Sequence, residues 1–161
     1  MFFEGDTMKI LQKIFIFYII ILSILLLIKF NFSMHYILEK INSINLSREQ
    51  GAWNINLVPF RTISSQLHLL KILPSIAVKN LIGNIVIFAP FGFLFPMGYK
   101  NMRKCHRTFM AGLIYILMIE FIQFVCMLGA FDVDDIILNS IGVICGFAVF
   151  EIARKKWEYR K

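Results

Sequence analysis

The sequence is poor in charged residues and lacks the common signatures of soluble enzymes. Only 17% of its 161 residues are charged, against about 25% in an average soluble domain. It contains no P-loop, no Gly-x-Ser-x-Gly and no His-Glu-x-x-His motif. Nucleophilic catalysis by serine or cysteine therefore has no support in the sequence, and we expect neither a metal nor a cofactor.

Cysteine is also scarce. There are three cysteines, an odd number, and no two of them form a C-x-x-C pair. A disulfide framework is therefore not expected. We interpret Cys105, Cys126 and Cys145 as small core residues.

What the sequence has in excess is hydrophobic residues, at 58% with a mean hydropathy of +0.72. A chain of this size cannot hide so much apolar surface in a water-soluble core. Because a membrane helix needs about 20 apolar residues, the apolar stretches predict four spans at about 11–30, 80–99, 108–130 and 135–153. The expected fold is an all-α bundle of four transmembrane helices in a single domain, 1–161.

The positions of the basic residues predict the orientation of these spans. The formal net charge is +7, which could suggest nucleic-acid binding if the charge lay on one surface. Instead, basic residues precede the first span, fill 100–107 and follow the fourth, whereas the link before the fourth span holds only Asp132, Asp134 and Asp135. Positive residues mark cytoplasmic loops, so we expect a multi-pass membrane protein with both termini cytoplasmic and no nucleic-acid partner.

The segment 31–79 between the first two spans is too long for a plain connection. Apolar residues recur at helical spacing from Ile63 to Ile76, although Pro74 interrupts the pattern, and a shorter series runs from Met34 to Ile41. We therefore predict one or two amphipathic helices lying in the outer interface.

The third span carries a carboxylate inside an otherwise apolar helix. Glu120 and Gln123 lie three residues apart and share a helix face. Intramembrane carboxyl groups are costly and normally face the bundle or a wet cavity. An apolar setting also favours the neutral acid, which makes Glu120 a candidate general acid or base.

Other polar residues occur at matching depths in the second and fourth spans. Asn80 and Asn84 share one face of the second span, and Asp135 and Asn139 lie one turn apart at the start of the fourth. With the orientation above, all of them lie on the outer side together with Asp132. We therefore predict a polar site that faces the outer leaflet.

Two further patterns concern helix shape. Pro90, Gly92 and Pro96 predict a kinked or broken second span. Gly142 and Gly146 form a G-x-x-x-G pair, which predicts a close helix contact.

Structural explanations compete with functional ones for each polar group. Glu120 and Gln123 could form hydrogen bonds between helices or could handle a substrate or a proton. The three aspartates at 132, 134 and 135 could be helix caps or, with Glu120, a cation site. The asparagines could join helices.

The order of these residues resembles the VanZ-like membrane protein family over about 56–146. The shared pattern is Asn56-x-x-Pro59-Phe60, Asn80-x-x-Gly83-Asn84, Phe88-x-Pro90-x-Gly92, Glu120-x-x-Gln123, Gly129-x-x-Asp132-x-x-Asp135 and Asn139-x-x-Gly142. The resemblance implies a four-span fold in a bacterial plasma membrane and a role in low-level resistance to teicoplanin and related lipoglycopeptides. It implies a phenotype rather than a reaction.

The sequence therefore leads to one main functional hypothesis with alternatives. The site would bind or alter a membrane lipid or a lipid-linked cell-wall precursor, so that it affects the lipoglycopeptide indirectly. The candidate substrate-binding residues are Asn80, Asn84, Gln123, Asp132 and Asn139, and the candidate catalytic residues are Glu120 and Asp135. The alternatives are an intramembrane enzyme, a small transporter that would need to form a homo-oligomer, and a scaffold subunit.

Overall fold

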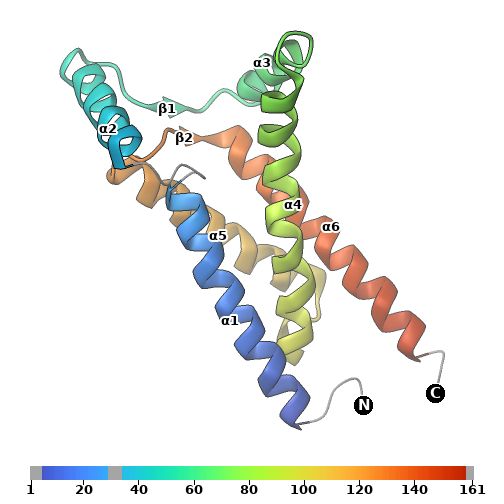
Figure 1. The fold of residues 1–161 in the computed structure, drawn as a ribbon. Helices are drawn as coiled ribbons and strands as arrows, with labels where there is room; N and C mark the ends of the chain where they lie inside the picture. Colours follow the sequence, from blue (N-terminus) through green and yellow to red (C-terminus); the bar gives the residue numbers. More distant parts are fainter. Residues whose placement is uncertain (1–4, 29–33, 159–161) are drawn as a thin grey trace.

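The computed structural model of the chain describes residues 5–28 and 34–158, and its body is a bundle of four long helices (Figure 1). These helices are α1 (Gly5–Ile28), α4 (Pro74–Gly98), α5 (Cys105–Val125) and α6 (Val133–Glu158). Each contains a segment long and apolar enough to cross a membrane. The predicted all-α fold with four transmembrane helices is therefore confirmed.

The remaining elements gather at one end of the bundle, which we call the loop end. They are α2 (Met34–Glu49), β1 (Ile55–Asn56), α3 (Arg61–Leu69) and β2 (Phe131–Asp132). Figure 1 shows α1 beginning and α6 finishing at the opposite end, which we call the terminal end. The short 3₁₀ helix η1 (Lys100–Met102) follows α4, which also finishes there.

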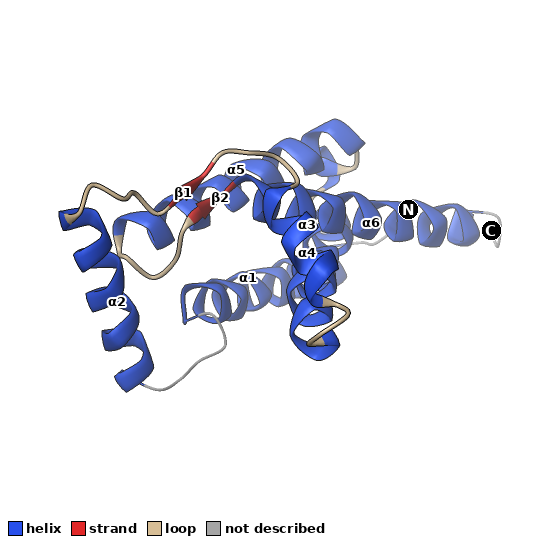
Figure 2. Cartoon of the chain, turned by 90° about the horizontal axis from the view of Figure 1, so that it is seen from above, coloured by secondary structure: helices blue, strands red, loops and turns tan. Residues whose placement is uncertain are grey.

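Two very short strands were not expected from the sequence. β1 and β2 pair in parallel, with Ile55 opposite Phe131 and Asn56 opposite Asp132. Seen from above in Figure 2, the pair lies between α2 and α3. It joins the long segment before α4 to the link between α5 and α6.

The predicted interfacial helix around Ile63–Ile76 is shorter than expected, and the second span is longer. α3 ends at Leu69, and α4 begins at Pro74 rather than at Asn80. Proline fits the first turn of a helix because its missing N–H has no intrahelical partner there. Pro74 is therefore a helix start, and Ile76 belongs to α4.

The other helix limits also differ from the predicted spans. α5 ends at Val125 instead of about 130, because the chain turns at Met127, whose φ is 57°. α1 begins at Gly5, so Lys9 and Lys13 lie within its first turns. The shorter predicted helix that starts near Met34 is a 16-residue helix, α2.

Of the two shapes predicted for the second span, kinked or broken, the broken one is wrong. α4 continues as one helix through Pro90 and Pro96. Pro90 cannot donate to the carbonyl of Val86, and the next carbonyl, of Ile87, accepts a hydrogen bond of 2.6 Å from the Tyr18 hydroxyl of α1. The unbroken helix removes the only feature that favoured a transporter.

Glycines bring α4 and α6 into their close contact, as the G-x-x-x-G pair predicts. A Cβ atom at Gly142 would collide with the Ile85 carbonyl, and one at Gly146 with the Ala89 carbonyl. On the other helix, a Cβ at Gly92 would strike the backbone of Val143. The two backbones therefore touch, which fixes the relative position of their polar residues.

Apolar and aromatic residues from all four helices fill the centre of the bundle. The buried cluster includes Phe15 of α1, Phe88 and Phe91 of α4, Ile116 of α5 and Val143 of α6. The rings of Phe91 and Tyr115 stack with their centroids 5.8 Å apart.

The interpretation of the three cysteines as small core residues is wrong. Cys105, Cys126 and Cys145 are all exposed. Cys145 directly precedes Gly146 on α6, so it points about 100° away from the glycine stripe that faces α4. Its thiol therefore lies on the outer surface of the bundle.

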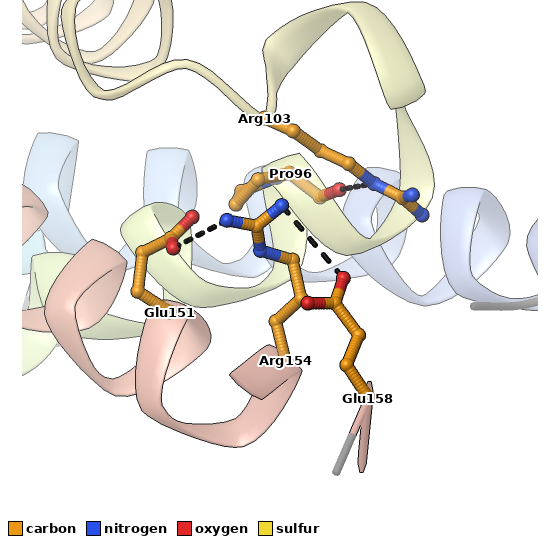
Figure 3. Close-up of polar contacts among 5 residues, drawn as sticks. All are labelled: Pro96, Arg103, Glu151, Arg154 and Glu158. Atoms are coloured by element: carbon orange, nitrogen blue, oxygen red, sulfur yellow. Dashed lines mark hydrogen bonds and ion pairs between the residues drawn. The ribbon is translucent and has the colours of Figure 1, made fainter. Parts of the chain in front are cut away.

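Ion pairs and a hydrogen bond of two arginines lie at the terminal end (Figure 3). Arg154 of α6 contacts Glu151 at 2.7 Å and Glu158 at 3.9 Å. Arg103, in the link after α4, donates a hydrogen bond of 3.3 Å from Nε to the carbonyl of Pro96. Burial lowers the pKa of the Arg103 guanidinium, and the nearby charge of Arg154 lowers it further. The two ion pairs therefore stabilise the last turns of α6, and the Arg103 bond joins the α4–α5 link to the end of α4.

Candidate functional site

The best-defined polar contacts at the loop end involve a carboxylate that is completely buried. Asp134, the second residue of α6, has no exposed surface. Its Oδ1 accepts the backbone N–H of Phe60 at 2.6 Å, and its Oδ2 accepts that of Ile63 at 3.0 Å. Asp134 therefore caps the start of α3, a helix 71 residues earlier in the chain.

Asp132 makes a second set of contacts to the same segment. It accepts hydrogen bonds from the Asn56 amide at 3.0 Å and the Thr62 hydroxyl at 2.6 Å. The backbone N–H of Asp134 also donates to Asp132, at 2.9 Å. These contacts favour the structural explanation for Asp132 over the predicted role in substrate binding.

The segment that these aspartates hold includes a residue in an unfavourable backbone conformation. Phe60 has a φ of 65°, which is uncommon for a bulky residue and costs of order 1–3 kcal/mol. The short bond from its N–H to Asp134 offsets part of this cost. The turn at Pro59-Phe60 therefore depends on the start of α6.

Asn84 and Asp135 join α4 to α6 directly. The Asn84 amide donates a hydrogen bond of 2.7 Å to the Asp135 carboxylate. The structure thus brings together two of the predicted site residues from different spans. Asn80, one turn earlier on α4, is exposed and is not part of the buried polar layer described next.

Three more of the predicted residues form a buried polar layer. The side chains of Glu120, Gln123 and Asn139 are 3%, 2% and 3% exposed. Gln123 donates from Nε2 to the carbonyl of Leu26 near the end of α1, at 2.7 Å. Its Oε1 and the Oδ1 of Asn139 have no hydrogen-bond partner within residues 5–28 and 34–158.

Helix register places these groups at similar depths. Gly112 of α5 packs against Val143 of α6. Glu120 follows Gly112 by eight residues, and Asp135 precedes Val143 by eight. Because the two helices are antiparallel, both carboxyl groups lie about 12 Å from that contact, towards the loop end. The expected gathering of polar groups at one end of the bundle is therefore observed.

The chemistry of this layer is that of hydrogen-bond acceptors. The carboxyl oxygens of Glu120 and the amide oxygens of Gln123 and Asn139 suit hydroxyl or amine donors. Among the described residues, no group of three or more His, Cys, Asp or Glu side chains is arranged to hold a metal ion. The layer therefore offers hydrogen-bond acceptors that suit donor groups of a ligand.

Some of the contacting residues were missed by sequence analysis. Thr62 and Arg48 make side-chain contacts across the loop end, to Asp132 and to Phe124. Each partner lies 70 or more residues away, and neither contact leaves a local signal in the sequence. For Thr62, the only signal was its position two residues after the Pro59-Phe60 motif.

Four spans, close glycine packing and a polar layer at one end define a multi-pass helical membrane protein. The chain belongs to the VanZ/LLP1 family, whose family model matches residues 15–154. It is similar to "Protein VanZ" from Enterococcus faecium, with 28% identity over 108 residues. That alignment covers 67% of this chain and 59% of the relative, so this chain spans less than two thirds of the relative's length. No solved structure matches the chain.

From the hydrogen bonds to Asp134 we expect its substitution to lower the overall stability and to free two backbone amides. Asp134→Ala should lower the free energy of unfolding by about 2–3 kcal/mol, because two charge-assisted bonds are lost and two backbone N–H groups lose their partner. Hydrogen exchange should become faster at the amides of Phe60 and Ile63. The control is Asp6→Ala, which removes a carboxylate that is 95% exposed. Unchanged exchange at Phe60 and Ile63 would contradict the capping role.

Proposed function

We propose that this VanZ-like protein lowers susceptibility to teicoplanin and related lipoglycopeptides by binding or altering a lipid-linked component of the bacterial envelope. The ligand would meet the buried polar layer of Glu120, Gln123 and Asn139 from the outer leaflet. The observation that carries this proposal is the pair of buried amide oxygens, on Gln123 and Asn139, without partners in the described parts of the chain.

The energetic cost of this layer supports a role beyond holding helices together. A buried polar atom without a hydrogen-bond partner costs about 1–3 kcal/mol, and carboxyl groups within transmembrane segments are rare and costly. Polar side chains that only join helices would form hydrogen bonds with one another, as the Asn84 amide does with the Asp135 carboxylate. A ligand with hydroxyl or amine groups would instead supply the missing donors to Gln123 and Asn139.

The charge distribution supports placing the loop end outside the cell. The exposed basic residues at the terminal end are Lys9, Lys13, Lys100, Lys104, Arg107, Lys155 and Lys156. The link between α5 and α6 at the loop end has no Lys or Arg. By the positive-inside rule the terminal end is cytoplasmic, so a lipid inserted in the outer leaflet of the plasma membrane meets the loop end.

An intramembrane enzyme is the second candidate, and one observation favours it. Glu120 and Asp135 lie at the same depth on facing helices, and Glu120 is buried. A buried carboxyl group can act as a general acid or base, and a second carboxyl group at the same depth would be its partner. The lipid-linked substrate would then be altered rather than only bound.

The exposed cysteines allow a direct test of orientation. A variant that keeps only Cys126, at the loop end, should react with a membrane-impermeant maleimide on intact cells. A variant that keeps only Cys105, the first residue of α5 at the terminal end, should react only after the cells are permeabilised. The opposite labelling pattern would reverse the proposed orientation.

The proposed function is tested by susceptibility in a deletion strain complemented with variants. Glu120→Gln should leave the strain as susceptible to teicoplanin as the deletion, because the ionisable group of the polar layer is lost. Vancomycin susceptibility, measured in parallel, should change less because that drug lacks a lipid tail. The matched control is Glu49→Gln, an exposed carboxylate at the loop end, which should complement fully. If Glu120→Gln complemented fully at an equal expression level, the proposed role of the Glu120 carboxyl group in the polar layer would be contradicted.

A further inference from the structure

Arg48, in the last turn of α2, is held in place by three contacts at the loop end. Its Nη2 donates a hydrogen bond of 2.7 Å to the carbonyl of Phe124 near the end of α5. Its guanidinium carbon lies 4.7 Å from the centre of the Phe124 ring and 5.7 Å from that of Trp53. Cation–π contacts of this kind fix the guanidinium plane before any ligand arrives.

One buried donor of Arg48 remains without a partner. Nε is buried and has no hydrogen-bond partner among the residues that the structure describes. The carbonyl of Phe124 uses only one of the five guanidinium N–H groups. A buried donor on a charged group is costly unless an acceptor is supplied, so the arrangement lacks an acceptor, and an anion fits a guanidinium best.

The depth of Arg48 in the membrane indicates what this anion is. α5 has 21 residues, so it spans about 31 Å, close to the hydrocarbon thickness of about 30 Å. Phe124 is the last residue but one of α5, which places its carbonyl at the edge of the hydrocarbon. Trp53 beside it is 65% exposed, as is typical of aromatic residues in the interface. Lipid phosphate groups lie at this level.

We propose that Arg48 binds the phosphate of a phosphorylated lipid whose remaining polar groups reach the layer of Gln123 and Glu120. Gln123 directly precedes Phe124 on α5, so the phosphate contact lies beside the polar layer. This inference rests on the proposed function and names the chemistry of its ligand. It also gives a role to α2, which lies before Asn56, the first residue of the pattern that carries the family resemblance.

The test measures binding of polyprenyl lipids to the purified full-length protein in detergent. Undecaprenyl phosphate and undecaprenol differ only in the phosphate, so the ratio of their affinities isolates the phosphate contact. The variants are Arg48→Gln, Arg48→Lys and, as a control with the same charge change at the loop end, Arg61→Gln. Arg61 is exposed and lies at the start of α3.

Arg48→Gln should weaken binding of undecaprenyl phosphate roughly tenfold or more, the loss expected for a charged hydrogen bond. Its affinity for undecaprenol should not change, and Arg61→Gln should leave both affinities unchanged. Arg48→Lys should recover only part of the phosphate affinity, because an ammonium group cannot form the bidentate contact.

Three results would overturn the inference. If Arg48→Gln lowered the affinities for undecaprenyl phosphate and undecaprenol equally, Arg48 would only cap α5. Equal losses of phosphate affinity in Arg48→Gln and Arg61→Gln would show unspecific attraction. Equally strong competition by inorganic phosphate would show a site for any phosphate rather than for a lipid. In each case the susceptibility result for Glu120→Gln could still support the proposed function, so the two failures are distinguishable.

Discussion

The arrangement of the loop end depends on the buried carboxylate of Asp134. Its two oxygens hold the backbone N–H groups of Phe60 and Ile63, so the segment before α4 is fastened to the first turn of α6. Asp132 extends this contact to Asn56 and Thr62. Because a buried carboxylate requires several donors to offset its desolvation, the turn and α3 must form together with the start of α6. The acidic link is therefore a structural clamp beside the candidate site.

Close helix packing determines where the remaining polar groups lie. Gly142 and Gly146 allow α6 to touch the backbone of α4, and this contact brings Asn84 to Asp135. In the neighbouring layer, the amide group of Gln123 donates a hydrogen bond to α1. The side-chain oxygens of Gln123 and Asn139 have no partner among the described residues. The carboxylates of the clamp and the Asn84–Asp135 pair have hydrogen-bond partners within the protein. Gln123 and Asn139 each keep an acceptor that has none among the described residues, and this difference is why we place the ligand there.

Hydropathy and charge were sufficient to predict the four spans, since both are read along the chain at the length scale of one helix. Spacing of three or four residues also predicted that Glu120 and Gln123 share a buried face and that Gly142 and Gly146 meet a neighbour. Contacts between distant segments could not be predicted in this way. The pairing of β1 with β2 and the cap from Asp134 to α3 each join residues about 70 positions apart. The role of Pro74 was misjudged because a proline that interrupts a pattern can equally begin the next helix.

The most direct test of the central claim is the substitution Asn139→Leu, with two measurements on the same purified protein. Leucine has the same branching and the same number of side-chain atoms other than hydrogen, but no polar atoms, so it removes the unpartnered acceptor without leaving a cavity. Our account predicts that thermal stability stays the same or rises, and that the lipid-linked species copurifying with the unsubstituted protein, detected by mass spectrometry, is lost. A fall in thermal stability with the copurifying lipids unchanged would show instead that Asn139 joins helices, and the polar layer would not be a binding site.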